Sequence, residues 1–164
     1  MKAVLVSIRA PYADLILHGR KTVELRRRAF SRPVDLLFIY VPRPIQRIAA
    51  YAPVRQIDKD TPENIWLRYH PTLGVNRDEY LVYFTGAESA VAIVLGTPVN
   101  LPRLIPLAEL GLTPPQSYIY LRDSQTDYLL GQLRPPSDEN QLHMEFHPNE
   151  LLPKAVDIGP KMRV

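Results

Sequence analysis

Ten residues near the N-terminus, GRKTVELRRR from Gly19 to Arg28, set one carboxylate among five basic side chains. Alternate side chains of an extended strand share a face, which predicts Glu24 beside Arg26 and Lys21 on the opposite face. Lys21 and Arg26 can neutralise phosphates, and Glu24 can orient one of them or accept from a base amino group. The leading glycine and the central acid indicate a built site. The alternative is a solvated strand edge that its charges keep from aggregating.

Aromatic and further polar residues could complete a nucleotide site. Tyr12 or Tyr118 offers a ring on which a base can stack, although the spacing of Tyr12 with Leu15 and Ile16 favours a core position in a helix. The lone tryptophan, Trp66, has helical spacing that also favours the core. The remaining candidates are basic residues for the rim of the site, Arg9, Arg27 and Arg28, and polar residues after a Pro-Pro turn, Gln116 and Ser117, which the turn itself explains nearly as well.

Composition narrows the class of protein. With 164 residues, 46% of them hydrophobic, the chain can bury one core and carry an appendage. Residues 1–122 hold 16 basic and 10 acidic side chains, net +6, whereas residues 123–164 hold 4 and 7, net −3. Fifteen of the twenty basic residues are arginine, whose planar fork suits phosphate. The body therefore favours a polyanionic partner, and the tail does not.

Several function classes are excluded or unsupported. The chain has no cysteine, which excludes disulfides, thiolate nucleophiles and cysteine metal sites. Its apolar runs are too short to cross a bilayer and no secretory signal is visible, so we expect a cytoplasmic protein without membrane association. His143 and His147 have a spacing that can hold a metal on a helix, but Pro148 interrupts it. We expect neither metal nor cofactor.

The elements that must position these side chains follow from periodicity and caps. Pro11 begins a short helix that ends at Gly19, and Thr61 and Asn76 have the character of N-caps for two more. Pro53 indicates that its strand lies at a sheet edge or has a bulge. The expected strands are 2–8, the basic segment, 35–41, 47–57, 89–96 and 117–121, with a helical turn at 107–111.

Strands that do not alternate regularly with helices indicate the α+β class, here a small mixed β-barrel flanked by short helices. The strand pattern is lost after Arg122, where the chain becomes acidic and proline-spaced. We therefore expect one domain over residues 1–122 and a C-terminal extension over 123–164 that wraps over the body or is partly disordered.

The segment VSIRAPYADLILHGRKTVELRRR resembles the opening of ASCH-domain proteins, a branch of the PUA-like β-barrel superfamily. The family signature GxKxxExR is matched by Gly19, Lys21, Glu24 and Arg26. The likeness continues through ENIWLRYHPTLGVNRDEYLVYFTG to LGLTPPQSYIYL and so covers roughly residues 3–121. The resemblance implies a barrel with a cleft beside the first helix, lined by the signature residues, that holds RNA or a modified nucleotide.

One ASCH relative is an amidohydrolase acting on N4-acetylcytidine, and this chain resembles it only in part. Lys21 is kept, but Glu24 stands in the place of that enzyme's threonine, and residues 72–74, before the third helix, contain no carboxylate. A lysine-activated hydroxyl nucleophile needs both partners, so this chemistry does not carry over.

Three hypotheses follow from the residues and the resemblance. The leading one is an RNA- or nucleotide-binding module, regulatory in RNA metabolism, translation or transcription. The second is a small hydrolase on modified nucleosides or RNA, amidohydrolase- or nuclease-like, with Glu24 as base and Lys21 as electrostatic stabiliser. The third is a regulatory module with a protein partner on the C-terminal extension.

Overall fold

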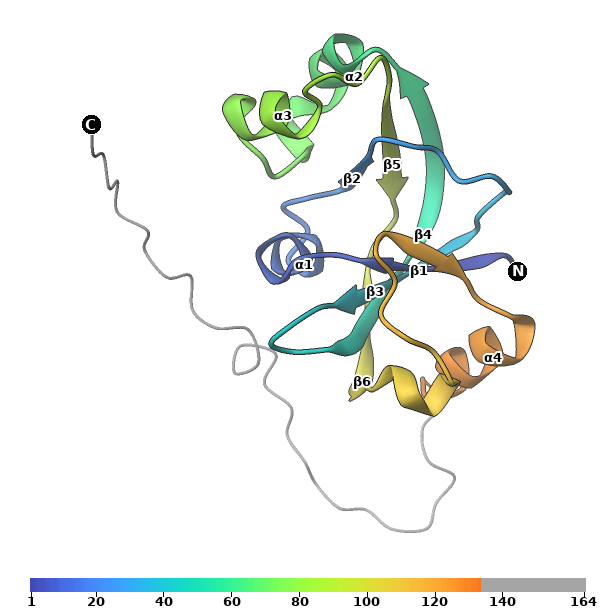
Figure 1. The fold of residues 1–164 in the computed structure, drawn as a ribbon. Coiled ribbons are helices and arrows are strands. Elements are labelled where there is room, and N and C mark those ends of the chain that lie inside the picture. Colours follow the sequence, from blue (N-terminus) through green and yellow to red (C-terminus); the bar gives the residue numbers. More distant parts are fainter. Residues whose placement is uncertain (134–164) are drawn as a thin grey trace, which may run out of the picture.

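The computed structural model describes residues 1–133, and these form one mixed seven-stranded sheet with helices packed around it (Figure 1). The strand order is β2-β5-β4-β3-β1-β7, with β6 paired to β4. The β1 and β3 strands are parallel, and all other pairs are antiparallel. The strands are β1 (Ala3–Ser7), β2 (Val23–Arg26), β3 (Leu36–Val41), β4 (Arg47–Asp60), β5 (Ala90–Leu95), β6 (Val99–Ile105) and β7 (Tyr118–Tyr120).

The α+β class and the mixed sheet with short flanking helices are confirmed. Within the described residues β2 and β7 lie at opposite ends of the strand order and do not pair, so the sheet is not closed into a full barrel. The long strand β4 pairs with β3 along its first half and with β5 along its second half. A register shift between Val54 and Gln56 follows Pro53 directly, which confirms the bulge.

Two helices, α2 and α3, begin at the N-caps that the sequence predicts. The helices are α1 (Ala10–Leu17), α2 (Pro62–Tyr69), α3 (Arg77–Tyr83) and α4 (Asp123–Gly131), with 3₁₀ turns η1 (His70–Thr72) and η2 (Leu107–Leu110). The Thr61 hydroxyl accepts from the Asn64 amide at 3.3 Å, and Asn76 forms a capping box with Glu79. Figure 1 shows α2 and α3 together at one end of the sheet and α4 at the other.

Three apolar clusters hold these layers together. Val4, Val6 and Ile8 face α1, whereas Ala3 and Leu5 of the same strand face the opposite side of the sheet. Both faces of β1 are buried, which explains its continuous apolar run. The third cluster joins α2 and α3 to β2 and β5, and it contains Val23, Leu25, Ile65, Leu73, Tyr80 and Phe84, with Trp66 packed against it.

Two elements lie where the sequence predicts none. The β6 strand runs through Pro102, and it pairs with β4 alone among the described strands, an edge position in which proline is tolerated. The α4 helix begins one residue after the expected domain boundary, and its Leu129 is fully buried in the second cluster. His143 and His147 lie outside the described residues. No helix of residues 1–133 is long and apolar enough to span a membrane.

Candidate functional site

A pocket of about 420 Å³ opens where α1, β2 and α3 meet. Its charged side chains are Arg9, Lys21, Glu24, Arg26 and Glu79, and its apolar and aromatic lining includes Tyr12, Val75, Tyr80, Val82 and Tyr83. The pocket thus brings together five of the residues predicted from the sequence, all from the first 26 positions, and sets them against one face of α3.

Lys21 lines the pocket and has only 3% of its surface exposed. Its ammonium donates to the Leu73 carbonyl at 2.7 Å and lies 3.4 Å from Glu24. The expectation that Lys21 faces away from Glu24 is therefore wrong. The reason is that β2 begins only at Val23, and the backbone amide of Lys21 is instead bound to the Leu15 carbonyl at the end of α1.

Gly74 makes room for this lysine. Its φ of +66° lies in the left-handed region, and a Cβ added there would meet Lys21 Cβ at 3.1 Å and a Leu15 methyl at 3.0 Å. Only a residue without a side chain lets the loop before α3 pass this close to the lysine stem.

Glu24 is bracketed by two cations. One carboxylate oxygen lies 3.1 Å from the Arg26 guanidinium, and the other faces Lys21. The contact with Arg26 is the one that alternation along the strand predicted. Arg26 also donates to the Ser7 carbonyl at 3.0 Å, while its Nε has no partner in the described residues. Glu24 is 7% exposed, so the interpretation of these residues as a solvated edge is wrong, although β2 is an edge strand.

Burial sets the protonation chemistry of the pocket. Desolvation lowers the pKa of Lys21 below its ordinary 10.5, and the nearby Glu24 carboxylate only partly offsets this effect. On the opposite wall, burial raises the pKa of Tyr80 to about 12 and also raises that of Tyr83. Both phenols therefore stay neutral, whereas the amine is more easily deprotonated than a free lysine.

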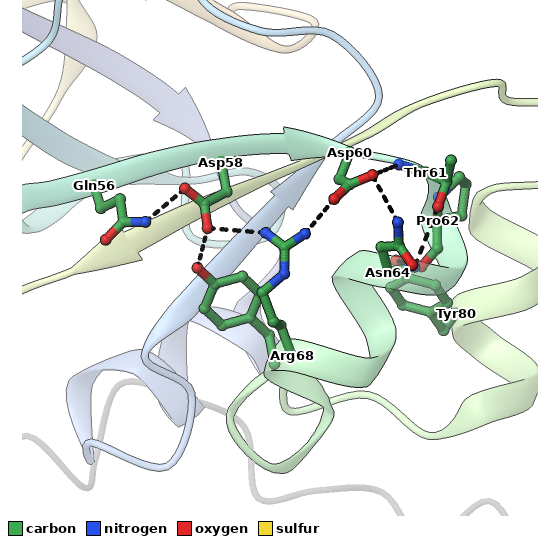
Figure 2. A network of polar contacts seen from close by, with 9 residues as sticks. Gln56, Asp58, Asp60, Thr61, Pro62, Asn64, Arg68 and Tyr80 are labelled. Atoms are coloured by element: carbon green, nitrogen blue, oxygen red, sulfur yellow. Dashed lines mark hydrogen bonds and ion pairs between the residues drawn. The ribbon is translucent and has the colours of Figure 1, made fainter.

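A polar network anchors α2 to β4 and α3 to the start of α2 (Figure 2). The Arg68 guanidinium lies between the carboxylates of Asp58 and Asp60 and pairs with both. The Tyr80 hydroxyl donates to the Pro62 carbonyl at 2.7 Å and ties α3 to the start of α2. These contacts fix the position of the helix that faces Lys21.

The other predicted residues lie outside the pocket lining. Arg27 donates to the Thr85 carbonyl at 3.1 Å, and Arg28 and Gln116 are exposed. The Ser117 carbonyl accepts from the amide of Ser7 at 3.0 Å. Ser117 is therefore hydrogen-bonded through its backbone to a pocket residue, but does not line the pocket itself. Tyr118 packs edge-on against Phe30 with ring centroids 4.8 Å apart.

Tyr12 combines the two roles that its spacing left open. It packs against the first core cluster and also lines the pocket, with Arg9 and Lys21 both within 6 Å of its ring centroid at 5.8 and 5.7 Å. Tyr12 therefore contributes both to the packing of α1 on the core and to the lining of the pocket.

The wall on α3 and the contribution of Ser7 and Glu79 were not predicted from the sequence. One signal was available, because residues 80–84 are five consecutive apolar or aromatic residues, more than one helix face can bury. Val82 is 75% exposed and Tyr83 is 40% exposed accordingly. Glu79 supplies a carboxylate at the pocket, but it also accepts from the Asn76 amide at 3.0 Å as part of its helix cap.

Residues 1–133 contain no group of three or more side chains of the kinds that hold a metal ion. The expectation of no metal and no cofactor stays a prediction for the protein as a whole.

Comparison with known proteins agrees with this architecture. The ASCH domain model matches residues 6–98, more than half of the chain. An ASCH domain-containing ribonuclease of Zymomonas mobilis is 31% identical over 135 residues, which cover 79% of this chain and 90% of the relative.

Solved structures give the same result. The crystal structure of ASCH from Zymomonas mobilis has a TM-score of 0.71 at 30% identity, covering 79% of this chain and 94% of that one. A tyrosine-to-phenylalanine variant of that protein has a TM-score of 0.72 at 29% identity, covering 80% and 98%. The N-terminal domain of McrB from Staphylothermus marinus, at 7% identity and a TM-score of 0.52, covering 79% and 93%, shares the fold alone. The chain belongs to the ASCH domain family.

Proposed function

We propose that the protein binds RNA and that one unpaired nucleotide enters the pocket between α1, β2 and α3. The observation that carries this proposal is the buried pair Lys21 and Glu24, joined by the partly buried Arg26, at a pocket with aromatic walls. A buried ion pair is weak as a device for stability, since apolar residues of similar volume often stabilise as well or better. A binding role explains why three charges are kept there.

The chemistry of the lining fits the parts of a nucleotide. Arg9 is exposed at the rim and Arg26 has an unpaired Nε, so both suit phosphate oxygens. The rings of Tyr12 and Tyr83 suit a base that has left its stack. Glu24 presents carboxylate oxygens, which accept from a base amino group or a ribose hydroxyl.

RNA is favoured over other polyanions by the relative that is named a ribonuclease, which is 31% identical and matches this chain over 90% of its own length. Single strands are favoured over duplexes, because sequence-specific RNA recognition uses unstacked bases and a pocket can hold only a base that is splayed out.

The test is titration of short single-stranded RNA, at two salt concentrations, against wild type and the variants Lys21→Met and Arg26→Ala. Arg26→Ala removes a phosphate contact, so we expect weaker binding and a salt slope reduced by about one. Lys21→Met removes the positive charge beside Glu24, so we expect it to weaken binding as well. Lys59→Ala is the matched control, because Lys59 is exposed and lies outside the pocket. Equal loss in all three variants would show a diffuse charge effect and contradict the pocket as the site.

Glu24→Gln distinguishes repulsion from recognition. If Glu24 only repels phosphate, the variant binds every oligonucleotide more tightly. If Glu24 accepts from a base amino group, the variant loses about 1–3 kcal/mol of discrimination between bases that carry that group and bases that do not. The proposal expects the second result, measured with oligonucleotides that differ at one position.

A second candidate function is cleavage of the bound RNA, which is favoured by the relative that is named a ribonuclease and by the adjacent carboxylate and lysine. In this step the ribose 2′-oxygen forms a bond to the neighbouring phosphorus while the bond to the 5′-oxygen breaks. Glu24 takes the 2′-hydroxyl proton, Lys21 stabilises the charge on phosphorus, and water protonates the leaving oxygen.

End-labelled RNA incubated with pure protein tests this candidate. Cleavage should leave a 2′,3′-cyclic phosphate, and Glu24→Gln should remove the activity while the variant still binds RNA. A preparation of Glu24→Gln that cleaves as fast as wild type would contradict the assignment and indicate either another base or a contaminating nuclease.

A further inference from the structure

A strip of three aromatic rings and one arginine continues from the pocket along the sheet. It consists of Phe30, Arg32, Tyr118 and Tyr120, and we call it the aromatic strip. Tyr118 packs edge-on against Phe30 at 4.8 Å between ring centroids and against Tyr120 at 5.6 Å. The Arg32 guanidinium lies over the Tyr120 ring, 4.0 Å from its centroid.

The strip and the pocket are contiguous on one face of the sheet. Tyr118 pairs with Val6, the residue before Ser7, and Ser7 lines the pocket. The three rings of the strip pack against the same core cluster as Tyr12. Tyr118 is therefore the ring of the strip next to the pocket, and Tyr120 with Arg32 lies beyond it.

The segment between β2 and β3 is fixed where it carries Arg32. The backbone amide of Arg32 donates to the Tyr120 hydroxyl at 2.9 Å, and the Ser31 hydroxyl lies 3.3 Å from the same oxygen. Both exposed partners of this contact, Ser31 and Arg32, are thereby held above a half-buried ring. One face of the guanidinium is occupied by Tyr120, and the side chain as a whole is exposed.

We propose that the aromatic strip binds the nucleotide that follows the one in the pocket, with its base stacked on the free face of the Arg32 guanidinium. This inference rests on the proposed function. Arginine planes and aromatic rings are the surfaces on which unpaired bases stack, and the charge of Arg32 also attracts the neighbouring phosphate. The strip thereby makes the site longer than a single nucleotide.

Affinity as a function of ligand length tests the inference. The ligands are a nucleoside 5′-monophosphate and oligonucleotides of two, three and six residues that begin with the same nucleotide. Wild type should bind the dinucleotide and trinucleotide more tightly than the mononucleotide. Arg32→Ala and Tyr120→Leu should lose about five-fold or more of that gain and keep the mononucleotide affinity, which also reports that both variants are folded.

Two controls sharpen the result. Tyr120→Phe keeps the ring and loses the hydroxyl that holds the segment between β2 and β3. It should therefore retain most of the gain in affinity with ligand length. Arg20→Ala removes the same charge from an exposed position outside the pocket and the strip, and it should retain all of it.

The outcomes separate the two proposals. Wild type that binds none of the ligands contradicts the proposed function itself. If wild type binds the mononucleotide and gains affinity with ligand length, but Arg32→Ala keeps that gain, the inference about the aromatic strip is wrong. The proposal that a nucleotide binds in the pocket then still stands. A Tyr120→Phe variant that loses as much as Tyr120→Leu also overturns the inference about the aromatic strip, because the contact then acts only to anchor the segment between β2 and β3.

Discussion

Lys21 is the buried charged residue at the centre of the pocket chemistry. The charged amine is removed from water, and it is compensated by the Leu73 carbonyl, by the Tyr12 ring and by Glu24 as its counterion. Breaking such a pair by removing one partner typically destabilises by about 3–5 kcal/mol, because the other charge is left buried and unpaired. Glu24 keeps Arg26 as a second partner, so Lys21→Met should cost less than this range.

The lowered pKa of Lys21 predicts a pH dependence of stability. Below the folded-state pKa both states are protonated, and the cost of burying the charge is fully present. As the pH rises from there towards 10.5, the folded lysine loses its proton while the unfolded one keeps it, so the free energy of unfolding increases. Urea denaturation between pH 7 and 10.5 should show wild type gaining stability relative to Lys21→Met. A constant difference would contradict the lowered pKa.

Gly74 is the residue whose replacement should move Lys21 without touching its charge. Gly74→Ala meets a left-handed φ and contacts of 3.0–3.1 Å, so we expect a loss of about 1–3 kcal/mol in the free energy of unfolding. The folded fraction should also bind RNA more weakly, as Lys21→Met does. Gly86→Ala is the control, since its φ of +72° carries similar strain with no atom within 4 Å of the added Cβ. If both variants bind RNA equally, the packing of Lys21 against Gly74 does not govern binding.

The sequence predicted the contact between Glu24 and Arg26, which lie in one strand, but it did not predict the position of Lys21. Glu24 and Arg26 are two residues apart, so alternation alone places them on one face. The position of Lys21 depends on the end of α1 and on Leu73, 52 residues away, and no local pattern encodes that contact.

Among elements, α2 depends on a network of carboxylates on β4. The Tyr69 hydroxyl and the Gln56 amide donate to Asp58 and hold its pKa below 3.8, and Arg68 adds a smaller effect. A depressed carboxyl pKa contributes stability that is fully present above pH 3.8 and is lost as the pH falls through the folded value. We expect Asp58→Asn to unfold more easily at pH 7 and to lose less stability than wild type between pH 4 and pH 2, as thermal melts can show.

The α4 helix is the element that tests where the domain ends. Leu129 is fully buried, at 0% exposure, in the second core cluster. Gln125 of the same helix donates to the Leu110 carbonyl at 2.9 Å. Leu129→Ala should therefore cost about 2–5 kcal/mol. A chain ending at residue 133 should melt like the full chain, whereas one ending at 122 should melt lower. Equal melting of the two shortened chains would support the boundary at residue 122.

Elements were predictable where a cap or a periodicity marked them. The N-cap residues Thr61 and Asn76 predict α2 and α3, and the runs rich in apolar and β-branched residues predict β1, β3 and β5. The β6 strand was missed because prolines obscure its period, and α4 was missed because its apolar residues sit next to a proline-rich segment. Both elements depend on packing against distant strands, which local propensity does not report.

At the scale of the whole molecule, the sheet is a platform with a helical wall at one end. The pocket lies where the terminal strand β2 meets that wall, so its residues come from two distant segments, 7–26 and 75–83. The charge and the signature predicted one half of this site. The other half, on α3, emerges only when the sheet order brings residues 75–83 opposite β2.

The central claim is that RNA occupies this pocket, and photo-crosslinking tests it most directly. A short single-stranded RNA with one 4-thiouridine is crosslinked to the full chain, and the modified residues are mapped by mass spectrometry. If RNA enters the pocket, crosslinks form at Tyr12 and Tyr83, and they decrease when unlabelled RNA competes and in Arg26→Ala. Competable crosslinks confined to surfaces away from the pocket, such as Tyr128 on α4, would contradict this claim.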